Sequence, residues 1–257
     1  GMTTAIVIVF FLVYLGMILG GLPFLQLDRT GVALLGAIAL IGVGAISPEE
    51  AARAIHLPTV ILLFSFMVIS AQLRLGGFYP WVTLRLADAV LSPLALLGGI
   101  ITTVAVLSAV FSNDIVCLSI APVLADACVR RRLNPVPFLL ALACAANVGS
   151  AATLIGNPQN MLIGSALRLP FAGYAAAAAL PVALGLFATW TLIGWQSRGR
   201  WELSAELPKV GEPRENEGAL INRWQSAKGL IVAGALLVVF LFTPWPREVA
   251  ALTGAGV

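Results

Sequence analysis

The sequence predicts an all-α, polytopic membrane protein: one half of an inverted repeat, with a re-entrant helical hairpin and a discontinuous helix, followed by the start of the second repeat. Hydrophobic residues make up 60% of the 257 residues and charged residues 11%, whereas soluble domains average roughly 25% charged. Apolar runs of about 17 to 25 residues, the length that crosses a bilayer, recur along the whole chain. Two of the apolar segments are too long for one crossing and carry polar clusters.

The apolar runs place the elements in order. We expect crossings at residues 4–22, 30–46, 58–75, 137–168, 173–195 and 229–243, and a paired helical unit at 93–129. The first run lacks the basic flank and cleavage site of a signal peptide, so we expect it to be retained. Residues 196–228 carry six basic and five acidic residues and read as a cytoplasmic linker. The organisation is therefore a first repeat at 1–195, a linker at 196–228 and the start of a second repeat at 229–257.

The basic residues predict the orientation. With the N-terminus outside, twelve of the fifteen Lys and Arg residues face the cytoplasm, among them Arg130, Arg131 and Arg132. Cytoplasmic loops favour such an excess, so we expect the N-terminus outside in the cell inner (plasma) membrane. The basic pI is explained by topology, and we expect no nucleic-acid partner.

A repeat supports the two-part organisation. Residues 29–37, "RTGVALLGA", match residues 247–255, "REVAALTGA", at five of nine positions. An odd number of predicted crossings separates the two copies, which inverts the second one. Inverted repeats of this kind build many secondary transporters. We therefore expect this polypeptide to hold one repeat and the beginning of the next.

Residues 93–129 must fold back on themselves. As one helix they would span about 55 Å, nearly twice the hydrocarbon thickness. Ser112, Asn113 and Asp114 follow the midpoint and suit a turn. The tip either reaches water on the far side or ends inside the protein, where unpaired backbone groups act as ligands. Asp114 is either the N-cap of the second arm or a carboxylate that handles protons or cations.

Residues 137–168 are also too long for one crossing, and polar residues gather around their centre. The cluster consists of Asn147, Gly149, Ser150, Thr153, Gly156, Asn157, Pro158 and Asn160. Pro158 disfavours helical dihedrals at Asn157, and Gly149 and Gly156 allow conformations that other residues avoid. A helix broken at mid-bilayer would offer carbonyls to a small cation and a half-helix N-terminus to an anion.

These two segments resemble the ion transporter superfamily, which includes divalent anion/sodium symporters, citrate transporters and arsenical-pump membrane proteins. The resemblance is carried by "FSNDIVCLSIAPVLADA" at 111–127 and "ANVGSAATLIGNPQNMLIG" at 146–164. In the symporters a Ser-Asn-Thr motif at a hairpin tip contacts sodium and a substrate carboxylate, and a Gly/Thr-rich break ends in Pro-x-Asn. Ser112 and Asn113 match that motif, whereas Asp114 stands where the symporters have Thr. This departure leaves the substrate and the coupling ion open.

The polar clusters and the resemblance together predict two sets of site residues; the resemblance itself covers Ser112, Asn113, Gly149, Thr153, Gly156, Asn157, Pro158 and Asn160. The substrate-binding set is Ser112, Asn113, Asp114, Asn157, Pro158 and Asn160. The cation-binding set is Ser112, Asn113, Asn147, Gly149, Ser150, Thr153 and Gly156. We expect ion-coupled secondary transport of a small anion, a carboxylate or an inorganic oxyanion, by alternating access, with Na⁺ or H⁺ as coupling cation and no other cofactor. Membrane lipid is an expected partner, and the full-length chain is expected to form a homodimer.

Two alternatives remain. The first is a proton or cation exchanger, or an arsenite-type metalloid efflux permease, on the same scaffold; Asp114 is its main support. The second is an intramembrane protease, which the sequence disfavours because Asp114 and Asp126 lie twelve residues, or about 18 Å, apart on one arm. The lone histidine, His56, lies near a predicted surface and cannot serve a serine nucleophile. We therefore predict that the protein is not an enzyme.

Overall fold

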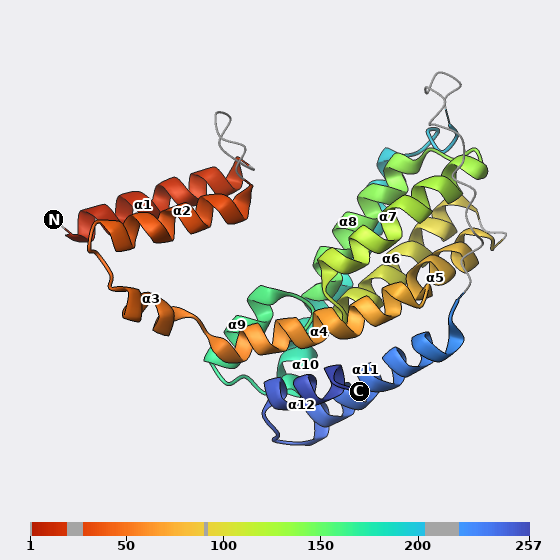
Figure 1. Cartoon of the computed structure of the whole chain (residues 1–257). Helices are drawn as coiled ribbons and strands as arrows, with labels where there is room; N and C mark the ends of the chain where they lie inside the picture. The colour runs from red at the N-terminus through yellow and green to blue at the C-terminus, as the bar shows by residue number, and fades with distance from the viewer. Residues whose placement is uncertain (1, 20–27, 90–91, 204–220) are drawn as a thin grey trace. The chain divides into compact units, whose positions relative to one another are not determined.

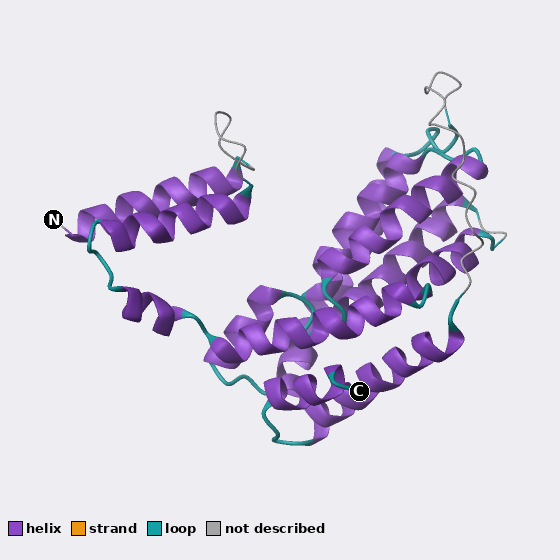
Figure 2. Ribbon diagram, viewed as in Figure 1, coloured by secondary structure: helices purple, strands orange, loops and turns teal. Residues whose placement is uncertain are grey.

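The computed structural model describes residues 2–19, 28–89, 92–203 and 221–257. Over these ranges the chain forms twelve helices (Figure 1). Figure 2 shows that helices account for the regular structure of these ranges, which confirms the expected all-α fold. The chain divides into two compact units, Gly1–Leu57 and Pro58–Val257.

The first unit contains α1 (Met2–Ile18), α2 (Arg29–Gly42) and α3 (Pro48–Ala54). Glycines let α1 and α2 pack closely, because Val32 lies against Gly16 and Val13 lies against Gly36. The helices expected at 4–22 and 30–46 are present but shorter, and part of the first range lies outside the described residues. The apolar pattern did not predict α3, which is only seven residues long.

A capping box begins α3 and predicts a pH effect. The Ser47 hydroxyl accepts from the Glu50 N–H at 3.1 Å, and the Glu50 carboxylate accepts from the Ser47 N–H at 2.8 Å. Hydrogen bonds from the backbone and then the hydroxyl of Ser47 lower the pKa of Glu50. A lowered pKa stabilises the cap above the usual glutamate range, and this stabilisation is lost as the pH falls through the folded-state value. NMR of α3 should therefore detect fraying on acidification. Glu50→Gln, which keeps the box without titrating, should show no such transition; identical pH curves would contradict the assignment.

The second unit positions the candidate site. Its helices are α4 (Leu57–Leu75), α5 (Phe78–Ala87), α6 (Pro93–Val110), α7 (Asn113–Arg130), α8 (Pro135–Ser150), α9 (Pro158–Ala166), α10 (Phe171–Gln196), α11 (Arg223–Phe242) and α12 (Arg247–Ala255). In the described ranges, α4, α6, α10 and α11 are long and apolar enough to cross a membrane. The chain is thus a multi-pass membrane protein.

Several expected boundaries differ from the observed ones. The helices predicted at 58–75 and 173–195 are present as α4 and α10. In contrast, α11 begins at Arg223, six residues before the crossing predicted at 229–243. The side chain of Asn222 caps its N-terminus by accepting from the Gln225 N–H at 3.1 Å. Polar residues in the first turns of α11 lowered the local hydropathy, so the apolar pattern placed the helix start too late.

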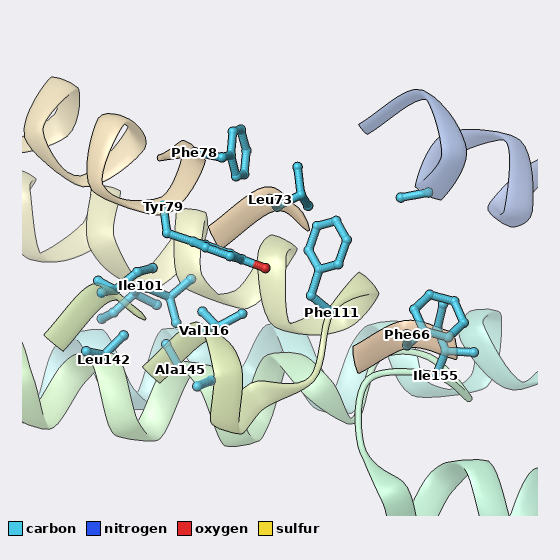
Figure 3. Packing of buried hydrophobic residues seen from close by; sticks show 14 of the residues in the cluster. Phe66, Leu73, Phe78, Tyr79, Ile101, Phe111, Val116, Leu142, Ala145 and Ile155 are labelled. Carbon is cyan, nitrogen blue, oxygen red and sulfur yellow. The ribbon is translucent and has the colours of Figure 1, made fainter. Parts of the chain in front are cut away.

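A buried core surrounds the end of α6 (Figure 3). Tyr79 and Ser70 are fully buried, and their hydroxyl oxygens lie 2.7 Å apart, so each is paired. The Tyr79 ring meets the Phe111 ring edge to face, with centroids 6.3 Å apart. Phe111 directly follows α6 and is itself buried. The core therefore fixes the point at which the chain turns from α6 into α7.

Candidate functional site

The first discontinuity is the tip of a helical hairpin. Only Phe111 and Ser112 separate α6 from α7, which confirms the predicted turn. Ser112 occupies the N-cap position of α7, although its side chain makes no capping hydrogen bond. Asp114 lies in the first turn of α7 and is exposed. The reading of Asp114 as the N-cap is therefore wrong, because the helix already begins at Asn113.

The second discontinuity is the predicted helix break. Helix α8 ends at Ser150 and α9 begins at Pro158, so residues 151–157 interrupt the crossing. Asn157 caps α9, and its Oδ1 accepts from the Asn160 N–H at 2.8 Å. Pro158 stands at the first helical position, where a missing N–H removes no helical hydrogen bond. The break is thus an ordered helix end followed by an ordered helix start.

The reason predicted for the two glycines of this segment is wrong. Neither Gly149 nor Gly156 has a positive φ, the conformation for which glycine is usually required. Instead, a Cβ on Gly156 would lie 2.2 Å from the Ser150 carbonyl oxygen and 2.8 Å from the Ser108 carbonyl oxygen. A Cβ on Gly149 would lie 2.4 Å from the Ala105 Cα. Both glycines therefore allow close approach of backbone to backbone between α6 and the broken helix.

Hydrogen bonds join the tip to the break. The Asn113 N–H donates to the Gly156 carbonyl at 3.4 Å, and the Asn113 side-chain amide donates to Asn147 Oδ1 at 3.1 Å. The Thr153 hydroxyl donates to the carbonyl of Ala109, in the last turn of α6. The broken helix then continues for the nine residues of α9, or about 13 Å. The tip meets the crossing partway along its length, which favours the re-entrant reading (Figure 1).

Two buried side-chain oxygens at this junction have no hydrogen-bond partner among the described residues: Ser108 Oγ and Asn113 Oδ1. The Asn147 amide sets the orientation of Asn113. Its NH₂ group donates to the Ala143 carbonyl at 2.9 Å, so its Oδ1 is left to accept from Asn113. Asn113 Oδ1 is consequently left unpaired. An unsatisfied buried polar group costs about 1 to 3 kcal/mol, and a bound cation would offset that cost at both oxygens.

Most other predicted site residues hold the break together. Ser150 Oγ donates to the Asn147 carbonyl at 2.8 Å and lies 3.1 Å from the donating amide of Asn157. The Asn160 amide donates to the Thr153 carbonyl at 2.9 Å and to the Tyr174 hydroxyl at 2.9 Å. The Thr153 hydroxyl also accepts from the Ile155 N–H at 3.2 Å. These contacts make the segment a rigid cradle of carbonyl groups.

Sequence reasoning missed Ser108 and Tyr174. Ser108 lies in an apolar helix, four residues before Ser112, and looked like an ordinary packing serine. The four-residue spacing between Ser108 and Ser112 was the available signal, because it places Ser108 one helical turn before the tip. Tyr174 lies in the first turn of α10, outside the predicted break, and nothing in its local sequence links it to Asn160.

Comparisons with known proteins show the family of the chain. The model of the Citrate transporter (CitMHS) family matches residues 4–257. The chain is 38% identical over 152 residues to "Silicon efflux transporter LSI3" of Oryza sativa subsp. japonica, covering 59% of this chain and 31% of the relative. It is 33% identical over 147 residues to "Putative transporter arsB" of Dictyostelium discoideum, covering 57% and 26%. It is 31% identical over 209 residues to "Magnetosome protein MamN" of Paramagnetospirillum magneticum, covering 78% and 47%.

The matched regions span less than half the length of these three relatives. The family model, however, covers nearly the whole chain, and it describes a family of transporters rather than enzymes. The chain therefore belongs to the citrate transporter (CitMHS) family of multi-pass membrane proteins.

Proposed function

We propose that the full-length protein is a secondary transporter that couples the movement of a small anion to a cation, by alternating access. The observation that carries this proposal is the pair of buried, unpaired oxygens, Ser108 Oγ and Asn113 Oδ1, beside the two helix discontinuities. In a family of transporters, an unsatisfied polar site at such a junction is best explained by an ion that is not part of the chain.

The junction offers a cation subsite. The C-terminal ends of α6 and α8 bring carbonyl groups to it, and helix C-termini carry partial negative charge. The carbonyl oxygens of Ala109 and Gly156 each accept one hydrogen bond and retain a second lone pair. Together with Ser108 and Asn113, these groups are oxygen donors, the kind of ligand with which interrupted helices coordinate Na⁺. We propose that these oxygens bind the coupling cation.

The anion subsite would lie at the N-termini of α7 and α9, which carry partial positive charge. The amide groups of Asn157 and Asn160 are engaged within the break, so they act by holding the α9 N-terminus in place. Asp114 would repel an anion at this position unless it is neutralised. We therefore propose that the cation, Na⁺ or H⁺, binds first and that the anion follows.

A second candidate function is efflux of a metalloid hydroxide, or cation exchange. Its support is the exposed carboxylate of Asp114 in the first turn of α7. An uncharged hydroxide would bind beside that carboxylate without repulsion. The names of two relatives, a silicon efflux transporter and arsB, point the same way.

A ligand panel on the full-length protein separates these candidates. Thermal unfolding would be followed with citrate, succinate, sulfate and arsenite, each with and without Na⁺ and at two pH values. Anion symport predicts stabilisation by one anion that depends on the cation. Stabilisation by arsenite alone would favour the metalloid permease. No response to any anion in any cation would overturn the proposed anion transport.

Two matched serines test the cation subsite. Ser108 and Ser119 are both buried and carry unpaired hydroxyls, but Ser119 lies about two turns along α7 from the tip. Ser108→Ala should raise the half-saturating cation concentration about tenfold or more, because a contact to a charged group is worth about 1.5 to 3 kcal/mol. Ser119→Ala should leave it unchanged. Equal effects of the two substitutions on cation-dependent uptake would count against the assignment.

A further inference from the structure

The hydroxyl of Tyr174 reaches the helix break from a different helix. It donates to the Ala151 carbonyl at 3.1 Å and accepts from the Asn160 amide at 2.9 Å. Ala151 is the first residue of the break, so the contact lies where α8 stops being helical. The Tyr174 hydroxyl therefore donates its hydrogen to the backbone of the break, and one of its lone pairs accepts from Asn160, which also bonds the break.

The Asn160 amide depends on this contact for its orientation. Its NH₂ group donates to the Thr153 carbonyl, which lies within the break, and to the Tyr174 hydroxyl, which comes from α10. Thr153 in turn is bonded to Ala109 at the hairpin. A continuous chain of hydrogen bonds thus runs from Tyr174 through Asn160 and Thr153 to the end of α6.

The first turn of α10 is itself firmly held. Phe171 is buried, and the centroid of its ring lies 5.7 Å from the ring centroid of Phe240 in α11. The Tyr174 N–H donates to the Pro170 carbonyl at 3.0 Å, which fixes the start of the helix. The first turn of α10 therefore holds the Tyr174 hydroxyl in a fixed position. A residue that sets the geometry of a site must itself be held in this way.

We propose that Tyr174 is a positioning residue for the coupling-cation site, acting through Asn160 and the carbonyls of residues 151–157. The proposal rests on the proposed function, because it needs a cation at the junction. Among the described residues, Tyr174 forms no hydrogen bond with Ser108 or Asn113; it bonds the break, whose Gly156 carbonyl accepts from the Asn113 N–H. Its loss should weaken cation binding more than it slows the transport cycle.

Tyr174→Phe in the full-length protein tests this role. We expect the half-saturating concentration of the coupling cation to rise about fivefold to tenfold, while the maximal uptake rate stays within about twofold. Thr189→Val is the matched control on the same helix, because within the described part of the chain the Thr189 hydroxyl bonds only the Gly185 carbonyl one turn earlier. The control should match the wild type in both quantities.

Two further measurements separate positioning from general destabilisation. Hydrogen exchange should increase at residues 151–157 in Tyr174→Phe and not in Thr189→Val. Adding Asn160→Ala to Tyr174→Phe should cost less than the sum of the two single changes, because both act through one network. A wild-type protein without any cation response would overturn the proposed function and this inference with it. A normal wild-type response with Tyr174→Phe indistinguishable from Thr189→Val, in uptake and in exchange, would overturn this inference alone.

Discussion

Asn113→Ala in the full-length protein is expected to reduce ion-dependent uptake at least about a hundredfold while leaving membrane insertion intact. The substitution removes the buried Oδ1 that we assign to the cation and also the amide that donates to Asn147. Each contact to a charged group contributes about 1.5 to 3 kcal/mol, and the loss of Asn113 also leaves Asn147 Oδ1 without its donor. Uptake into proteoliposomes, normalised to the inserted protein, measures the effect.

Asn134→Ala provides the matched asparagine control. Asn134 caps α8 at the end remote from the break, where its side chain accepts from the Val136 N–H at 3.1 Å. Losing this cap should lower stability by about 1 kcal/mol without changing cation dependence. Wild-type uptake by Asn113→Ala would remove Asn113 from the site.

Gly156→Ala should produce the largest structural effect of any single methyl group added at the junction. The new Cβ would lie 2.2 Å and 2.8 Å from two carbonyl oxygens, and backbone atoms cannot swing aside as a flexible side chain can. Overpacking of this kind costs about 3 kcal/mol at its upper end, and it would push the break away from α6. We expect a lower unfolding temperature and loss of cation-dependent stabilisation.

Gly234→Ala is the corresponding control. Gly234 lies within α11, and a Cβ there would meet nothing within 4 Å. Alanine is the better helix former, so this change should be neutral or slightly stabilising. If Gly156→Ala behaved like Gly234→Ala, the close approach of the break to α6 would have no role in stability.

Length and polarity predicted the main outline of the site. Two segments too long for a bilayer had to be interrupted, and the positions of Ser112 and of Pro158 located both interruptions. Which oxygens remain unpaired could not be predicted, because that depends on hydrogen-bond partners that lie far away in the sequence. The sequence also did not reveal that the Asn147 amide orients Asn113.

The shorter helices and the role of the glycines were also beyond the sequence pattern. Helix α5 follows α4 with only two intervening residues, so its apolar residues did not stand out as a separate element. Neither Gly149 nor Gly156 has a positive φ, and the need for glycine comes from nearby backbone atoms of Ala105, Ser108 and Ser150. A local sequence motif shows that a glycine is present, but it does not show which neighbouring backbone atom leaves no room for a Cβ.

The convergence of four helix ends at one point also governs how the site acts at a distance. Two ends, of α6 and α8, contribute about half a negative charge each, and two, of α7 and α9, about half a positive charge each. At distances greater than a Debye length, the positive and negative partial charges of the four helix ends cancel. They therefore do not steer solutes toward the site and act only on a solute that is already in contact with it. Within residues 111–114 and 151–157 the one ionisable side chain is Asp114. The far field of the junction is therefore that of a single carboxylate, and capture of cations, rather than of anions, should slow as ionic strength rises.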